Sequence, residues 1–312
     1  MTKKDRFRRA INGDEVDRLP VSVWLHFASE HWPGEEVARL HLAYQAEYDW
    51  DYVKVMNDYR YPLPGIEAVE SGADLLRFEP LSMEEPAFAE QLKCLRRLRA
   101  ELPDVPLVET VFNPLQTIVR GAGRRVLDVM KAHPREAHHA LEACTETLVR
   151  YVRACREAGV DALFFSVNGA SRAGAPGGMS EEEYAEYVAP YDRRVLEAAE
   201  GMIRIAHVHG FQLEFDRVLS YPVEAYNWSH HHTAPSLRDA RRLTQAALIG
   251  GVNELDVASQ TPQEVAADIR AAVEEAGHRR FLVGSGCTVP PDTPRRILHA
   301  ARRAVEGLAL AW

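Results

Sequence analysis

The sequence of 312 residues contains no uninterrupted apolar run of about 18 residues, the length that a membrane-spanning helix needs. Its first residues, MTKKDRFRRAINGDEVDRLP, are charged and lack the apolar stretch of a secretory signal peptide. Positive charge is not in excess either: the formal net charge is -9, which argues against nonspecific binding to nucleic acid. These absences predict a cytoplasmic protein that acts on neither membranes nor nucleic acids.

Cysteine is scarce, and no two cysteines form a close C-x-x-C pair. The four cysteines are Cys94, Cys144, Cys155 and Cys287. Such a set favours a reducing compartment over a disulfide framework. Cys144 and Cys155 fall within a helical stretch, and we interpret them as small buried apolar residues. Cys287 differs, because it lies in a loop rich in glycine and proline, FLVGSGCTVPPDTP.

Short apolar segments alternate along the whole chain with longer segments that have apolar residues at three- and four-residue spacing. The eight predicted strands are residues 20–27, 51–56, 105–111, 160–166, 202–209, 223–228, 247–252 and 281–284. The clearest predicted helices are residues 84–102, 134–159 and 180–201. We therefore predict a single α/β domain over residues 1–312, a (β/α)8 barrel of TIM type. An open doubly wound sheet is the alternative, but no G-x-G-x-x-G follows the first strand.

Two histidines end the fifth predicted strand, in the segment RIAHVHGF. Because side chains alternate along a strand, His207 and His209 are expected to point the same way, with Gly210 ending the strand beside them. Cys287 follows the eighth strand at the same end of the barrel, where active sites of this fold form. Two imidazoles and a thiolate suit Zn²⁺ and leave a fourth position open. The alternative is a chance H-x-H among thirteen histidines and a cysteine that fills space.

Three segments resemble the uroporphyrinogen decarboxylase superfamily. RFRRAINGDEVDRLPV is similar to its opening, GMSEEEYAEYVAPYDRRV to its central helix, and VGSGCTVPPDTPRRIL to its closing loop and helix. The resemblance spans nearly the whole chain. It implies a (β/α)8 barrel, in agreement with the independent strand pattern, and a protein that forms a homodimer, as members of this superfamily often do.

The superfamily has two main branches, and the resemblance favours one of them. True decarboxylases have an arginine-rich segment after the first strand and a histidine in the closing loop. This chain has WLHFASEHWPGEE and Cys287 at those places. The other branch contains zinc-dependent methyltransferases that pass methyl groups between corrinoid proteins and thiols such as coenzyme M. Their motif is H-x-C with a second cysteine in the closing loop, so that His207 and Cys287 match, and His209 replaces the first cysteine.

The resemblance therefore implies a zinc-dependent methyltransferase-like enzyme, with the metal held by His207, His209 and Cys287. A small-molecule thiol is the expected nucleophile, and a corrinoid, on a partner protein, or a folate-like compound is the expected methyl donor. This chain shows no D-x-H-x-x-G cobalamin loop of its own. Two alternatives are a metal-free decarboxylase of a tetrapyrrole or other polycarboxylate, and a noncatalytic ligand-binding barrel.

Further polar residues near predicted strand ends are candidates for catalysis. Asp58 matches an aspartate of the decarboxylases, and Asp58 and Glu109 are expected to orient the substrate or complete the coordination. The alternatives without a catalytic role are a solvated loop acid for Asp58 and a strand-end charge paired with an arginine for Glu109. His230, the first of three consecutive histidines, is a candidate general base or fourth ligand, and the alternative is a surface run. A nitrogen-rich site would suit iron as well as zinc.

Substrate contacts are expected from two groups of residues. Ser166 and Asn168 lie in SVNGASRAGAPGGMS, a loop (166–180) rich in glycine and alanine that we interpret as a lid or a substrate-facing segment. Arg60 and Arg172 are the expected carboxylate clamps if the chain is a decarboxylase.

Overall fold

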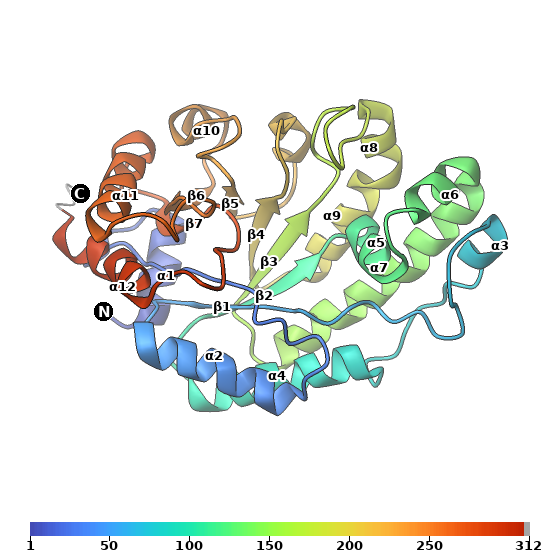
Figure 1. Ribbon diagram of the computed structural model, residues 1–312, viewed down its shortest axis with the longest axis horizontal. Helices are drawn as coiled ribbons and strands as arrows, with labels where there is room; N and C mark the ends of the chain where they lie inside the picture. The colour runs from blue at the N-terminus through green and yellow to red at the C-terminus, as the bar shows by residue number, and fades with distance from the viewer. Residues whose placement is uncertain (309–312) are drawn as a thin grey trace.

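Parallel strands curl around a common axis in the computed structural model, which describes residues 1–308 (Figure 1). Over these residues the sheet has seven strands, and each pairs with the next one along the chain. The strands are β1 (Val53–Val55), β2 (Leu107–Phe112), β3 (Ala162–Val167), β4 (Ile203–Val208), β5 (Ala225–Trp228), β6 (Ala247–Val252) and β7 (Phe281–Ser285). They are largely buried on both faces, as strands of a barrel covered by helices are.

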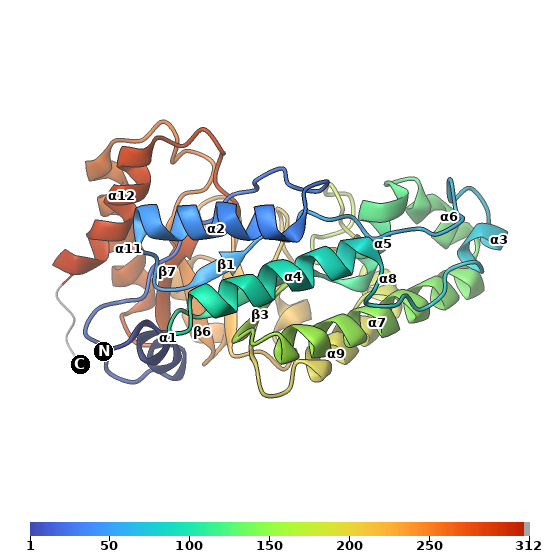
Figure 2. The ribbon, with the colours of Figure 1, turned by 90° about the horizontal axis from the view of Figure 1, so that it is seen from below.

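Helices surround the sheet, and α2, α4 and α7 lie side by side along one side of it (Figure 2). The α-helices are α1 (Lys3–Asn12), α2 (Gly34–Tyr48), α3 (Gly72–Leu75), α4 (Pro86–Glu101), α5 (Pro114–Ala122), α6 (Val126–Ala132), α7 (Pro134–Glu157), α8 (Glu181–Tyr187), α9 (Ala189–Ala198), α10 (Leu237–Leu243), α11 (Pro262–Ala276) and α12 (Arg295–Ala304). Two short 3-10 helices are η1 (Phe215–Val218) and η2 (Val305–Gly307). Among residues 1–308, no helix has both the length and the apolar character needed to span a bilayer.

The prediction of a regular first strand over residues 20–27 is wrong. Only Val21 forms a β-bridge, a parallel one to Val283 of β7. The Ser22 N–H donates to the Val283 carbonyl at 3.1 Å, and the Val283 N–H donates to the Pro20 carbonyl at 2.8 Å. The Asp51 N–H in turn donates to the Val21 carbonyl at 2.9 Å. This extended segment thus occupies the eighth position between β7 and β1, and the α/β barrel of TIM type is confirmed.

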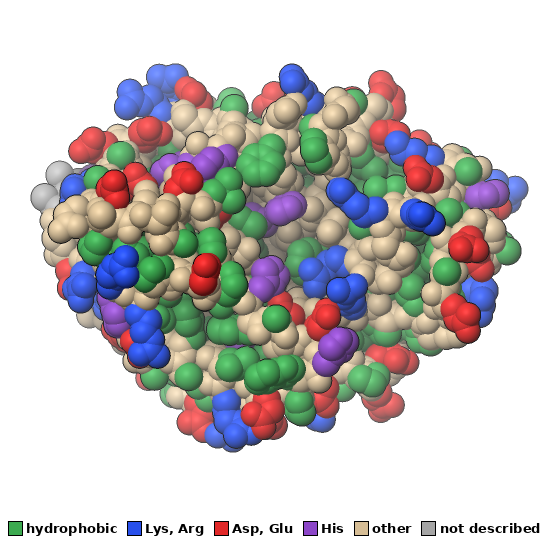
Figure 3. Space-filling model, in the orientation of Figure 1, with side chains coloured by type: hydrophobic (Ala, Val, Ile, Leu, Met, Phe, Trp, Pro, Cys, Tyr) green, Lys and Arg blue, Asp and Glu red, His purple; other side chains and the backbone are tan. Residues whose placement is uncertain are grey.

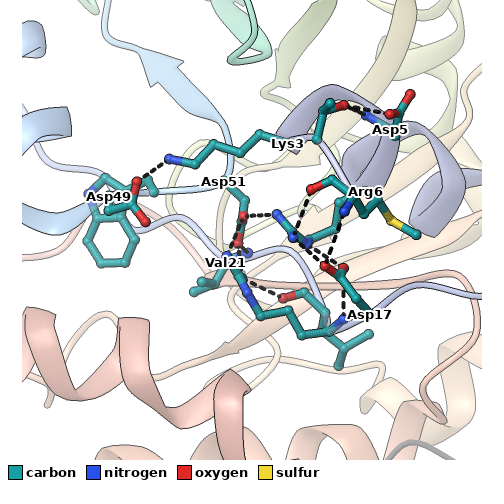
Figure 4. Close-up of polar contacts among 12 residues, drawn as sticks. Lys3, Asp5, Arg6, Asp17, Val21, Asp49 and Asp51 are labelled. Atoms are coloured by element: carbon teal, nitrogen blue, oxygen red, sulfur yellow. Dashed lines mark hydrogen bonds and ion pairs between the residues drawn. The ribbon is translucent and has the colours of Figure 1, made fainter.

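A buried network of charges explains why that segment is extended without being a strand (Figure 4). Pro20 has no N–H to donate, and the Val21 N–H donates to the side chain of Asp51 at 3.0 Å rather than to a neighbouring strand. Asp51 is fully buried and also accepts from Arg6 at 2.8 Å and from Arg18 at 2.9 Å. The carboxylate of Asp51 here replaces a backbone carbonyl as the acceptor, so the hydrogen bonds of this segment do not follow the regular pattern of a strand.

Two helices begin at residues whose side chains favour a helix start. Ser180 and Glu183 form a capping box at the start of α8, and α11 begins at Pro262. The segment predicted as one helix over 180–201 is two helices, because Pro190 stands in the first turn of α9 and cannot continue a helix from α8.

Candidate active site

Three possible metal ligands meet at the ends of two strands. His207 is the penultimate residue of β4, His209 follows that strand, and Cys287 follows β7. Their donor atoms all lie within 4.8 Å of one another, and Cys287 Sγ is 3.9 Å from His209 Nδ1. His207 is buried, Cys287 is half-buried and His209 is exposed, so the group, here called the His–Cys triad, is open to solvent on one side.

The register of the sheet places His207 between two polar neighbours. It pairs with Ser166 of β3 on one side and with Asn227 of β5 on the other, and paired residues share a face. The amide Oδ1 of Asn227 is 2.7 Å from His207 Nδ1. Because the amide nitrogen of Asn227 donates to the carbonyls of Ile249 and Ser285, at 3.0 Å each, Oδ1 is an acceptor. The proton of His207 therefore sits on Nδ1, and Nε2 is left to act as a ligand.

The triad is electrostatically suited to a cation. Burial disfavours the thiolate of Cys287, but hydrogen bonds and charge from His207 and His209 outweigh it and hold the pKa of that thiol well below its usual value. The same hydrogen bond with Cys287 raises the pKa of His209 against the opposing effect of burial. A low-pKa thiolate is the form of cysteine that binds metals.

Glycine allows the closing loop to reach the triad. The Gly286 N–H donates to the Val252 carbonyl at 3.3 Å, which ties the loop to the end of β6. A Cβ at Gly286 would lie 2.4 Å from a carboxylate oxygen of Glu254 and 2.9 Å from Cα of Ser229. Any other residue would push the loop outward, and Cys287 with it.

The donor set fits a zinc ion. The ligand atoms of a tetrahedral zinc site lie roughly 3.5 Å apart, so the 3.9 Å between Cys287 Sγ and His209 Nδ1 requires only a small side-chain adjustment. Two imidazole nitrogens and one thiolate match the borderline-soft character of the ion, and three protein ligands leave one position open.

A buried lysine lies beneath the triad. Lys54 of β1 has its ammonium 4.6 Å from the centre of the Phe164 ring, and Phe164 stacks on His207 at 5.0 Å. Burial lowers the pKa of Lys54 to about 7, although the negative charges of Cys287, Glu109 and Asp58 oppose the shift. The pKa of Lys54 therefore depends on the charge of Cys287 in the triad and on that of Asp58.

A cleft of about 870 Å³ opens at the same end of the barrel, between the first extended segment and the segments that follow β1 and β2. Its walls include His26, Asp58, Arg60, Arg120 and Arg124. Figure 3 shows histidine and basic side chains around a hollow near the middle of this face. Arg120 packs its guanidinium 4.0 Å from the centre of the Phe112 ring and donates to the Asp58 carbonyl at 3.3 Å. The cleft is therefore suited to a negatively charged ligand.

Asp58 is a buried and ionised carboxylate rather than a solvated loop acid. Its Oδ1 lies 2.5 Å from His26 Nδ1, and its Oδ2 accepts from the N–H and hydroxyl of Ser29 at 3.1 and 3.0 Å. Burial opposes ionisation, but the hydrogen bonds from His26 and Ser29 outweigh it and lower the pKa of Asp58.

Glu109 lies away from the barrel interior. It is fully buried, and its partners Tyr151 and Gln91 lie on α7 and α4, so its side chain faces the helices. Its oxygens accept from Tyr151 at 2.7 Å and from Gln91 at 3.0 Å. Burial raises the pKa of Glu109 to about 7, although the hydrogen bonds favour the carboxylate. No arginine pairs with Glu109 among the described residues, so it is not a strand-end charge paired with an arginine.

His230 is engaged elsewhere. Its Nε2 accepts from the Gly251 N–H at 2.9 Å, and its ring packs on His231 at 4.1 Å. Burial, together with the neighbouring His231 and His232, lowers the pKa of His230 to about 3. Within residues 1–308, none of the three consecutive histidines belongs to the group of ligand atoms that includes Cys287.

The predicted substrate contacts are dispersed. Ser166 is buried beside His207, and Asn168 is half-buried with its carbonyl accepting from Asn113 at 3.0 Å. Arg60 lines the cleft and pairs with Glu30 at 2.8 Å. Arg172 is exposed and donates to the side chain of Gln212 at 2.8 Å. The structure thus places Ser166 at the triad and Arg60 at the cleft.

Sequence reasoning missed three residues of this region: His26, Arg120 and Asn227. Asn227 could have been found, because it lies near the end of the predicted strand 223–228, which follows the predicted strand 202–209 that contains His207. His26 stands at the end of the segment that we predicted as the first strand. Arg120 lies in α5, which the sequence pattern did not single out.

An α/β barrel with a His–Cys triad and a basic cleft at the carboxyl ends of its strands has the layout of a barrel enzyme. Residues 56–308 match the family described as "Uroporphyrinogen decarboxylase (URO-D)". The chain belongs to this family. The uroporphyrinogen decarboxylase of Mycolicibacterium smegmatis is 29% identical over 248 residues, which are 73% of this chain and 67% of that protein. That of Syntrophotalea carbinolica is 27% identical over 255 residues, 76% of this chain and 70% of that protein.

Solved structures share the fold. A methyltransferase from Methanosarcina mazei superimposes with a TM-score of 0.77 at 17% identity, over 98% of each chain. A B12-independent methionine synthase from Shewanella sp. W3-18-1, in complex with selenomethionine, gives a TM-score of 0.63 at 13% identity, over 88% of this chain and 86% of that chain. At these identities the likeness concerns the fold alone.

Proposed function

We propose that this chain is a zinc-dependent enzyme of methyltransferase type, with the ion held by His207, His209 and Cys287. The observation that supports it is the convergence of these three donors, within 4.8 Å, where catalytic residues of α/β barrels lie. When bound, a zinc ion with one open position would lower the pKa of a substrate thiol and favour the nucleophilic thiolate.

The residues of the triad region and of the cleft have separate roles in this proposal. Asn227 holds His207 in the tautomer whose Nε2 is free. Arg60, Arg120 and Arg124 attract a negatively charged part of the substrate into the cleft. The methyl group comes from outside the barrel mouth, from a corrinoid on a partner protein or from another methyl donor. His230 is not part of the proposed machinery, since its Nε2 is already hydrogen-bonded to β6.

Elemental analysis of the purified protein tests the proposal. We expect about one zinc per chain in the wild-type protein and little in Cys287→Ala or His207→Ala. Two matched controls are Cys144→Ala, a buried thiol in α7, and His31→Ala, an exposed histidine, and both should keep the metal. A wild-type protein that stays free of metal, after purification without chelator and incubation with zinc, would overturn the proposal.

A decarboxylase acting on a polycarboxylate is the second candidate, and the cleft favours it. Asp58 lies there with three arginines, although none of them comes from residues 24–36, where the resemblance to the decarboxylases places an arginine-rich segment. Turnover of uroporphyrinogen by metal-free protein, lost in Asp58→Asn and kept in Cys287→Ala, would support this function. Uroporphyrinogen left unchanged by the wild-type protein would exclude it as the substrate.

A further inference from the structure

One contact in the cleft has the geometry of a catalytic dyad. His26 Nδ1 lies 2.5 Å from Asp58 Oδ1. An ionised carboxylate has only acceptors, and the pKa of Asp58 is lowered, so the hydrogen of this bond belongs to Nδ1. The lone pair of the neutral ring is then on Nε2, the nitrogen that points away from Asp58.

The carboxylate is itself held in place. Its second oxygen accepts two hydrogen bonds from Ser29, and Asp58 is only 7% exposed. The turn that brings Ser29 to it passes through Ala28 at a φ of 53°, in the left-handed region that is unfavourable for a residue with a Cβ. The fold therefore maintains a locally strained turn between His26 and Ser29, and both residues contact Asp58.

The imidazole is accessible where the carboxylate is not. The His26 side chain is 46% exposed and forms part of the wall of the 870 Å³ cleft. Its Nε2 makes no hydrogen bond to any of residues 1–308. The charged groups that line the same cleft are Glu30, Asp58, Arg60, Arg120 and Arg124. A buried anion behind an exposed imidazole is the arrangement in which a histidine moves protons for a substrate.

We propose that His26 is the acid–base residue of this cleft and that Asp58 is its positioning residue. The assignment rests on the proposed thiol methyl transfer. The S–H bond of the substrate thiol breaks, its proton passes to His26 Nε2, and the electron pair stays on sulfur. The sulfur then forms a bond to the methyl carbon, while the bond from that carbon to the donor breaks and its electron pair leaves with the donor. His26 returns its proton to water.

The rate of thiol capture tests this role without a methyl donor. The protein is loaded with Co²⁺, 3-mercaptopropionate is added, and the sulfur-to-cobalt absorption band is followed by stopped flow over a range of pH. His26→Asn keeps an amide near the position of Nδ1 but removes Nε2. We expect it to slow capture by roughly 10² to 10⁴-fold, because the nitrogen that accepts the proton is gone. Added imidazole should restore part of the rate.

Two further variants separate chemistry from structure. Asp58→Asn should also slow capture, but imidazole should not rescue it, because the cavity left by His26→Asn is absent. His31→Asn changes an exposed histidine of the same segment and should behave as wild type. Equal rates in wild type and His26→Asn, with the band present in both, would overturn the role of His26 alone. A band that never forms in the wild-type protein would overturn the proposed function and this assignment together.

Discussion

The backbone N–H of Val21 donates to the carboxylate of Asp51 at 3.0 Å, and the backbone N–H of Asp51 donates to the carbonyl of Val21 at 2.9 Å. This reciprocal pair joins the irregular first segment to the chain just before β1 (Figure 4). Because the same carboxylate also binds Arg6 and Arg18, closure of the barrel depends on one buried charge.

Asp51→Asn should therefore be strongly destabilising. The side chain keeps its shape but loses the charge that compensates two arginines, and breaking a buried ion pair in this way costs about 3–5 kcal/mol. Urea unfolding measures the change in free energy. Asp49→Asn is the matched control: this exposed aspartate also pairs with two basic residues, Lys3 and Arg302, and its loss should cost only about 0–1 kcal/mol. Equal effects of the two substitutions would contradict the role of Asp51.

The sequence predicted the ring of strands well, because seven of its eight apolar segments are regular strands. The first segment failed because its hydrogen bonds go to a side chain, Asp51, that lies 30 positions after Val21, and no local pattern reveals such a contact. The meeting of His207, His209 and Cys287 was predictable, since strand alternation and the common end of parallel strands place all three together.

The contact between His26 and Asp58 and the direction of the Glu109 side chain were harder to predict, for different physical reasons. His26 and Ser29 both contact Asp58, and the turn between them has Ala28 in a left-handed conformation, which alanine rarely adopts. Glu109 lies on a strand buried on both faces, where apolar residues do not alternate with polar ones. The pattern therefore does not reveal whether its side chain faces the barrel interior or the helices.

Glu109 should make the stability of the protein depend on pH. Its folded-state pKa, about 7, lies above the ordinary 4.5, so the folded protein holds a proton that the unfolded chain releases. Stability from this group is present below pH 4.5 and is lost as the pH rises to 7. The loss is on the order of 3 kcal/mol, at 1.36 kcal/mol per pKa unit.

Urea unfolding of wild type and Glu109→Gln from pH 5 to pH 8 checks this expectation. The amide resembles the protonated acid and does not titrate, so the variant should gain stability relative to wild type as the pH rises. Glu35→Gln, at an exposed position of α2, should follow the wild-type profile. Parallel profiles of wild type and Glu109→Gln would show that Glu109 titrates at the same pH in the folded and unfolded states.

Asn227→Ala should weaken metal binding without removing a ligand. The amide oxygen fixes the tautomer of His207, and loss of such a contact typically lowers metal affinity 10- to 100-fold. Competition with a chromophoric zinc chelator measures the affinity. Asn253→Ala removes an equivalent contact, 2.7 Å from His232, at a histidine outside the triad, and should leave the affinity unchanged. An unchanged affinity in Asn227→Ala would mean that His207 needs no support or is not a ligand.

His209→Cys should bind zinc more tightly than the wild-type protein. The new thiolate adds negative charge and a softer donor at a position already close to Cys287 Sγ, and zinc favours both. The same chelator competition should rank the proteins as His209→Cys above wild type and wild type above His209→Ala. Since His209 is exposed, neither substitution should disturb the core, and far-UV circular dichroism would verify that the fold persists. If His209→Ala bound zinc as tightly as wild type, then His209 would lie near the ion without coordinating it.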